Sequence, residues 1–150
     1  MNVMKLLVVL CVVLGLYQTP SAQQLVKFRG SDGWGHDSRY EQLFSGFDLQ
    51  TYIGDVVRID TVTPMQDMGV GIQIVLDYES EKIPVHLGPA WYILNQDINF
   101  PQDKEIEVRG CSAFYSSSEF IMPVEIRLKD RILRLRDEEG YPLWNVIRDD

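Results

Sequence analysis

Hydrophobic and polar residues alternate through most of the chain after residue 50. The clearest example occupies residues 70–78, where every second position is apolar or aromatic: Val70, Ile72, Ile74, Leu76 and Tyr78. A two-residue period is typical of a β-strand that buries one of its faces. The same kind of alternation predicts further strands over residues 51–63, 83–87, 105–109, 120–128 and 131–136.

A short segment between the third and fourth predicted strands interrupts the alternation. Gly88 and Pro89 end the third strand, and residues 90–94 are expected to form one or two helical turns. Three strands, a short helix and two or three further strands are the element order of an OB-type barrel, whose helix plugs one end. We therefore predict an all-β fold, a small OB-like β-barrel of five to six strands that is closed or partly open. An open β-sandwich of similar strand count is the alternative.

Residues 1–22 have the character of a secretory signal peptide. A single positive charge at Lys5 precedes an apolar run over residues 6–16, and small and polar residues then lead to Ala22. A helix needs about 20 apolar residues to cross a bilayer, so this run is too short. We expect cleavage after Ala22, export of the remaining chain and no stable membrane span afterwards. An uncleaved membrane anchor is the alternative.

The remaining chain divides into three parts by its pattern. Residues 23–49 are interrupted by glycines and are expected to form an irregular arm with one helical turn near residues 40–44. Residues 50–137 contain the predicted barrel, and residues 138–150 are expected to form an extended tail. The 150 residues are enough for one domain, and a hydrophobic content of 45% is that of a folded protein.

The charge of the chain argues against binding to nucleic acid. The 14 Lys and Arg residues against 22 Asp and Glu give a net charge of −8, which becomes −9 once Lys5 is removed with the leader. Affinity for nucleic acid depends largely on neutralising phosphates. One basic stripe opposes this balance, and its members are Arg127, Lys129, Arg131, Arg134 and Arg136. We interpret the stripe as the solvent-exposed face of a hairpin rather than a site for an anionic partner.

The sequence contains no catalytic motif. Cys111 is the one cysteine left after removal of the leader, so it cannot form an internal disulfide. Neither histidine is close to it in the sequence, whereas a nucleophilic thiolate needs an adjacent base. Gly-x-Ser-x-Gly and a glycine-rich phosphate loop are both absent. We therefore predict that the protein is not an enzyme and has no catalytic residues.

The best candidate for ligand or partner binding is the segment around the predicted helix. His86 lies on the face of its strand opposite the apolar residues, and Trp91 and Tyr92 follow directly after the Gly-Pro turn. A histidine beside two large aromatic side chains at the mouth of a barrel could bind a ligand or a partner. The alternative is that Trp91 plugs the barrel and His86 hydrogen-bonds to a loop.

A second candidate is a metal site. His36 lies between Asp32 and Asp37 in the sequence, and together with His86 it could complete a site for a transition metal such as iron or copper. No Cys and His spacing typical of zinc or covalent haem attachment is present. We expect no cofactor, with a transition metal as the alternative.

Three stretches carry a resemblance to a known family. They are Gly-Trp-Gly at residues 33–35, Val-His-Leu-Gly-Pro-Ala-Trp-Tyr at residues 85–92, and Leu-Arg-Asp-Glu-Glu-Gly-Tyr-Pro-Leu-Trp at residues 135–144. Through them the chain resembles the domain shared by the magnetosome-associated proteins MamS and MamX, and it is loosely similar to bacterial OB-fold periplasmic proteins. Trp34 and Arg136, which lie in the first and third stretches, join the candidate binding residues.

The resemblance implies the periplasm of a Gram-negative bacterium and a link to iron or redox handling. The chain lacks a haem-attachment motif, which argues against electron transfer. We therefore expect a non-enzymatic binding or adaptor module of the cell envelope, whose partner is an envelope protein or a small ligand. The alternative is a metal or redox accessory protein that uses His36 and His86.

Overall fold

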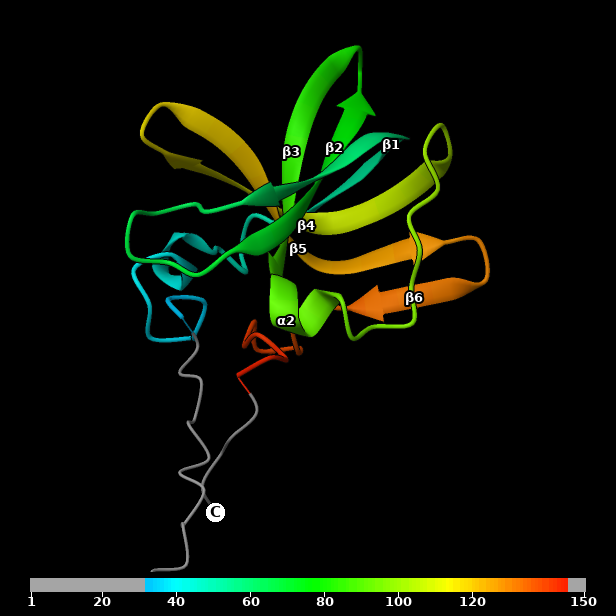
Figure 1. Cartoon of the computed structure of the whole chain (residues 1–150). Coiled ribbons are helices and arrows are strands. Elements are labelled where there is room, and N and C mark those ends of the chain that lie inside the picture. Colours follow the sequence, from blue (N-terminus) through cyan, green and yellow to red (C-terminus); the bar gives the residue numbers. More distant parts are fainter. Residues whose placement is uncertain (1–31, 146–150) are drawn as a thin grey trace, which may run out of the picture.

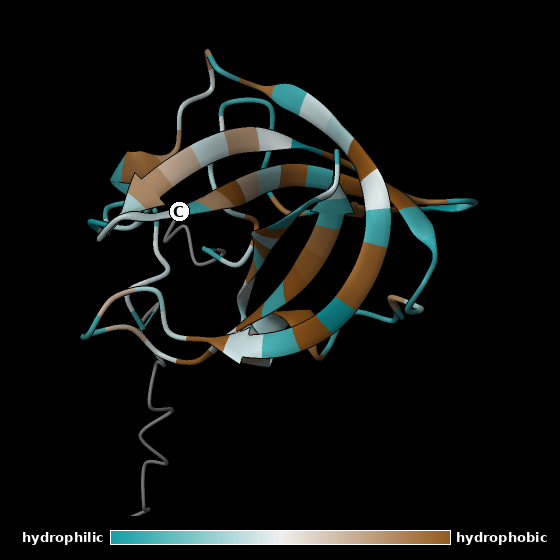
Figure 2. Cartoon of the chain, turned by 90° about the horizontal axis from the view of Figure 1, so that it is seen from above, coloured by the Kyte–Doolittle hydropathy of each residue, from teal (hydrophilic) through white to brown (hydrophobic). Residues whose placement is uncertain are grey.

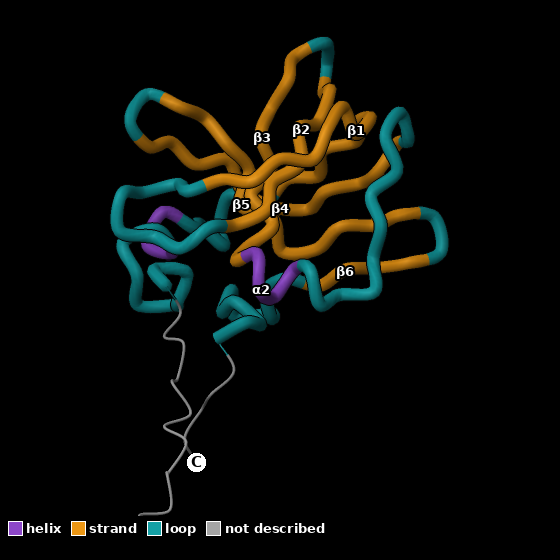
Figure 3. The backbone as a smooth tube through the Cα atoms, in the orientation of Figure 1, coloured by secondary structure: helices purple, strands orange, loops and turns teal. Residues whose placement is uncertain are grey.

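A computed structural model describes residues 32–145 of the chain (Figure 1). The predicted signal peptide, residues 23–31 and residues 146–150 lie outside the described residues. Strands dominate the described chain, with two very short helices, as Figure 3 shows. The elements are a 3-10 helix η1 (Glu41–Leu43), β1 (Gln50–Val62), β2 (Gly71–Tyr78), β3 (Glu81–Pro89), α2 (Ala90–Ile93), β4 (Glu105–Tyr115), β5 (Ser118–Leu128) and β6 (Arg131–Arg134).

The strands form one sheet that curls into a ring. Their order in the sheet is β3-β2-β1-β4-β5-β6, with antiparallel neighbours throughout. A parallel contact between β3 and β5, at the pair Val85 and Ile121, joins the two sides and closes a ring of five strands. The prediction of an all-β, barrel-like fold is confirmed, as is the position of the short helix between the third and fourth strands.

The ring closes because β1 bends between two neighbours. The first half of β1 pairs with β4, and the second half pairs with β2. Gly54 lies at the crossover, where a Cβ atom would stand only 2.1 Å from the carbonyl oxygen of Asp77. Any side chain at this position would therefore force the two backbones apart. A register shift between Val56 and Arg58 adds a bulge to the same bend.

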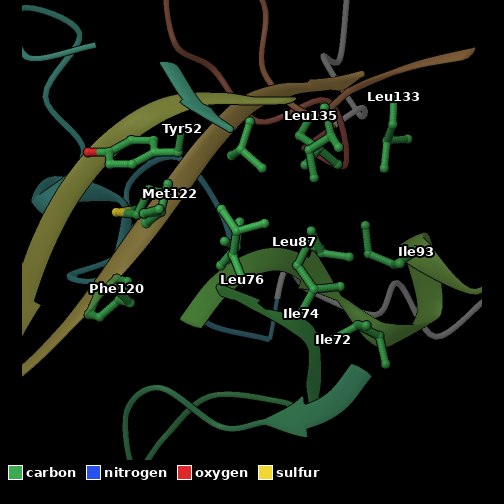
Figure 4. Packing of buried hydrophobic residues seen from close by; sticks show 14 of the residues in the cluster. Tyr52, Ile72, Ile74, Leu76, Leu87, Ile93, Phe120, Met122, Leu133 and Leu135 are labelled. Atoms are coloured by element: carbon green, nitrogen blue, oxygen red, sulfur yellow. The ribbon is translucent and has the colours of Figure 1, made fainter. Parts of the chain in front are cut away.

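The alternation of the sequence reappears as alternating bands of hydrophobic and hydrophilic residues along the strands (Figure 2). The apolar members point into the ring and pack into one core (Figure 4), including the fully buried Ile74, Leu76, Val85 and Leu87. Ile93 of α2 is also buried. The helix therefore covers one end of the ring.

The described parts of the arm and of the tail pack against the barrel. Trp34 and Tyr40 of the arm are as deeply buried as the strand residues of the core. The chain after β6 turns back on itself, with a backbone hydrogen bond of 3.0 Å from the Leu143 N–H to the Leu135 carbonyl. Residues 138–145 therefore form a folded loop instead of the extended tail that we expected.

Candidate functional site

His86 is enclosed instead of lying at an open mouth. Its neighbours Val85 and Leu87 point into the barrel, as predicted, but its own face of β3 is covered as well. The Tyr40 hydroxyl of the arm is 3.0 Å from His86 Nδ1, and the Phe120 ring stacks on the imidazole with 4.1 Å between centroids. Burial lowers the pKa of His86 from 6.5 to about 4, so the ring is neutral at pH 7.

The three tryptophans and Tyr92 form an aromatic cluster at the α2 end of the barrel. The ring centroids of Trp34 and Trp144 are 6.4 Å apart, and the Trp144 indole N–H donates to the Trp34 carbonyl at 2.6 Å. Tyr92 lies 5.7 Å from Trp144 and 6.0 Å from Trp91. Three of the candidate binding residues, Trp34, Trp91 and Tyr92, thus belong to one aromatic cluster. Trp34, however, is fully buried and contributes no surface.

Gly88 allows this cluster to form. Its φ of +143° is one that other residues rarely adopt. A Cβ atom there would lie 2.8 Å from the Trp144 ring. The Gly-Pro pair therefore ends β3 and also leaves room for an aromatic side chain from the far end of the chain.

The outer side of α2 presents apolar side chains to solvent. Leu94, directly after the helix, is 73% exposed, and Val70 is 53% exposed. The two segments are in contact, because the Ala90 N–H donates to the Val70 carbonyl at 2.9 Å. We call Val70, Trp91, Tyr92 and Leu94 the α2 surface. The Trp91 indole nitrogen is buried and has no hydrogen-bond partner in residues 32–145.

The interpretation of the basic stripe as the solvent-exposed face of a hairpin is wrong for Arg136. Its side chain is buried and forms a two-pronged ion pair with Glu41, with distances of 2.8 and 3.0 Å from Nη2 to the carboxylate oxygens. It also donates to the Pro123 carbonyl, and the guanidinium lies 4.9 Å from the centre of the Phe44 ring. Burial raises the pKa of Glu41, and the positive charge of Arg136 opposes that rise.

The physical reason for this error also explains the burial of His86. In both places the arm covers the side chain, because Tyr40 contacts His86 and Glu41 contacts Arg136. Arg127, Arg131 and Arg134 are exposed, as the interpretation required. No pattern in the sequence indicates Glu41 as the partner of Arg136, because the two are 95 residues apart.

A hollow of about 580 Å³ lies beside the ion pair. It runs between the arm, β5 and the loop after β6, and its walls carry both signs of charge. The charged members of the lining are Arg109, Glu125, Arg134, Arg136, Asp137, Glu138 and Glu139. Because acids and bases are interspersed, the hollow favours neither cations nor anions.

The two histidines of the predicted metal site have different neighbours. The His36 ring lies on the Tyr141 ring with 3.9 Å between centroids, whereas His86 contacts Tyr40 and Phe120. Within residues 32–145, no group of three or more His, Cys, Asp or Glu side chains is arranged to hold a metal ion.

Comparison with known protein families matches residues 48–133 to the MamS/MamX magnetosome protein family. This match covers more than half of the chain. The chain belongs to the MamS/MamX magnetosome protein family. The resemblance noted from the sequence is thereby confirmed at the level of the family. No functionally curated protein matches the chain.

The MamS/MamX match begins just before β1 and ends within β6, so it coincides with the barrel. It includes residues 85–92 but neither of the other two stretches that carried the resemblance. Those stretches supply Trp34, Arg136 and Trp144, which the structure packs against the matched part. None of the helices in residues 32–145 has the length and apolar character needed to cross a membrane.

Proposed function

We propose that this member of the MamS/MamX family is a non-enzymatic binding or adaptor module of the cell envelope. In this proposal the chain is exported to the periplasm of a Gram-negative bacterium and holds an envelope protein against its α2 surface. The leader-like composition of residues 1–22 supports the export step. The family match supports the broader setting.

The observation that carries the proposal is the α2 surface itself. Leu94 and Val70 expose large apolar side chains beside two half-buried aromatic residues, Trp91 and Tyr92. Grouped exposed apolar residues indicate interaction sites, and Trp and Tyr are enriched at protein interfaces. Tyr92 is held in place within this surface, because it packs on Trp144, whose indole is hydrogen-bonded to the backbone at Trp34. Binding of a partner would therefore cost little conformational entropy at this side chain.

Two observations support a role without catalysis. Cys111 is fully buried, its sulfur accepts the Ser45 N–H at 3.3 Å, and burial raises the pKa of the thiol. A nucleophilic cysteine needs the opposite shift. His86 is enclosed, and its Nδ1 is engaged by Tyr40, so it does not face a substrate.

Site-specific photo-crosslinking tests the proposal. A benzophenone amino acid replaces Leu94 in one variant and Ile132 in a control, since Ile132 of β6 is also apolar and is 50% exposed. Each purified variant is irradiated in an envelope extract of the source bacterium. We expect a discrete adduct from position 94 that is absent from position 132 and disappears when Val70→Glu is added. Equal labelling at both positions, or none at either, would refute binding at the α2 surface.

The same preparation distinguishes the alternative role in metal handling. Titration of the purified chain with iron and copper, followed by metal analysis, measures uptake directly. Uptake that is lost in both His36→Ala and His86→Ala would favour a metal accessory protein over an adaptor.

The mass of the protein recovered from the periplasmic fraction tests the expected cleavage after Ala22.

A further inference from the structure

The end of the barrel opposite α2 is open. Gly71 pairs with Pro89 next to α2, and Tyr78 pairs with Glu81 at the turn between β2 and β3. This turn and α2 lie at opposite ends of the two strands (Figure 1). β3 and β5 pair only at Val85 and Ile121 and do not pair beyond that point. A hollow of about 350 Å³ occupies this end. We call it the open mouth, and the residues of its lining that matter here are Gln50, Tyr52, Tyr78, Glu79, Glu81 and Glu119.

The open mouth carries negative charge without a counter-charge. Three carboxylates line it, and no Lys or Arg is part of the lining. Within residues 32–145, none of the three forms an ion pair. Glu119 is held in place, since the Ser112 hydroxyl donates to its Oε1 at 2.6 Å. The mouth therefore favours a cation.

Tyr52 adds an unpaired polar group to the same hollow. Its side chain is only 6% exposed, and its hydroxyl has no hydrogen-bond partner among the described residues. Figure 4 shows the oxygen end of Tyr52 directed away from Leu133 and Leu135 at the other end of the core. The hydroxyl oxygen is not among the buried atoms, so it is open to the hollow and available to a molecule held there.

The arrangement suits an organic cation better than a metal ion. A metal ion needs several ligand atoms that converge on one point, and no such group of three exists between residues 32 and 145. The carboxylates here are instead spread around two aromatic rings, Tyr52 and Tyr78, whose centroids are 5.2 Å apart in an edge-to-face arrangement. Aromatic rings attract ammonium groups and also pack against methylene chains.

We propose that the open mouth binds a primary ammonium group on an alkyl chain, with the charge among Glu79, Glu81 and Glu119 and the chain against Tyr52 and Tyr78. A free diamine and a lysine side chain both offer this chemistry. The site is separate from the α2 surface and does not depend on the function proposed for it.

Calorimetric titration of the purified chain tests the site with two probes, 1,5-diaminopentane and a short peptide with one lysine and blocked ends. The double substitution Glu81→Gln/Glu119→Gln removes two charges from the mouth. Glu138→Gln/Glu139→Gln is the matched control, because it removes two charges from the loop after β6. We expect saturable binding that weakens at least tenfold in the mouth variant and less than twofold in the control.

The remaining outcomes are equally decisive. Tighter binding of the peptide assigns the site to a protein lysine, and tighter binding of the diamine assigns it to a free amine. Tyr52→Phe is expected to weaken binding several-fold while leaving the unfolding transition unchanged. Absence of saturable binding with both probes would overturn the proposal. Equal weakening in the mouth variant and the control would also overturn it, because it would indicate attraction by net charge alone.

Discussion

The two ends of the barrel differ in what most of their polar groups contact: at the α2 end all but the Trp91 indole nitrogen are paired within the protein, whereas at the open mouth they face a hollow. At the α2 end, Glu41 pairs with Arg136, the Tyr40 hydroxyl meets His86, and the Trp144 indole donates to the backbone. At the open mouth the Tyr52 ring is buried as well, but its hydroxyl is open to the hollow and has no partner in the described chain. The carboxylates around Tyr52 likewise have no counter-charge.

The difference separates groups that hold the fold together from groups that are available to a ligand. An intramolecular hydrogen bond or ion pair between buried groups stabilises the native state only as long as both partners are present. An unpaired group at an opening contributes little to stability, but it can bind a ligand that supplies the missing hydrogen bond or counter-charge. Tyr40 and Tyr52 show this difference within one residue type, because the Tyr40 hydroxyl is paired within the protein and the Tyr52 hydroxyl is not.

The largest expected effect comes from breaking the buried ion pair. Arg136→Ala leaves the Glu41 carboxylate buried without its counter-charge and should lower the free energy of unfolding by about 3–5 kcal/mol. Urea denaturation measures the loss. Arg127→Ala is the control, because its guanidinium is half exposed and pairs with Glu125 at 3.2 Å, and such pairs contribute about 1 kcal/mol or less. Similar losses in both variants would contradict a structural role for Arg136.

Acidification should weaken the α2 end through His86. The folded pKa of about 4 lies below the value of 6.5 for an unperturbed histidine, so the unfolded state binds more protons between these values. The contribution to stability is therefore complete above about pH 6.5 and is lost as the pH falls towards 4, by about 3 kcal/mol in total. Urea denaturation of the wild type and of His86→Gln across this range measures it. Parallel pH profiles would show that His86 is not enclosed.

The smallest expected effects come from removing the hydroxyl group of Tyr40 or of Tyr52. Tyr40→Phe removes the bond to a buried His86 and should cost about 1–2 kcal/mol of unfolding free energy. Tyr52→Phe removes a hydroxyl that has no partner and should change it by less than about 0.5 kcal/mol. Thermal or urea denaturation of the two variants distinguishes these values. A larger loss for Tyr52→Phe would mean that its hydroxyl is paired within the protein.

The strands and the helix were predictable because their signals are local. The alternation at residues 70–78 reflects the burial of Ile72, Ile74 and Leu76 in the core, and the observed strand is Gly71–Tyr78. The Gly-Pro pair likewise marked the end of β3 and the start of α2. Both signals depend on residues that are neighbours in the chain.

The candidate site was predicted less well because it depends on contacts between distant segments. Arg136 was predicted on the last strand, but β6 ends at Arg134 and Arg136 lies in the loop that follows. Nothing in the pattern indicated that the arm would cover both side chains, with Tyr40 over His86 and Glu41 over Arg136. The open mouth was also missed, because Tyr52 and Glu119 are far apart in the sequence and meet only in the folded sheet.

The sequence alone determined the all-β character, the order of strands and helix, and the family, since each rests on residue type and short-range periodicity. Only the tertiary structure decided which outward-facing residues are buried and which end of the barrel is open. Those properties depend on closure of the ring at Val85 and Ile121 and on the packing of the arm. Both bring together residues whose separation along the chain carries no periodic signal.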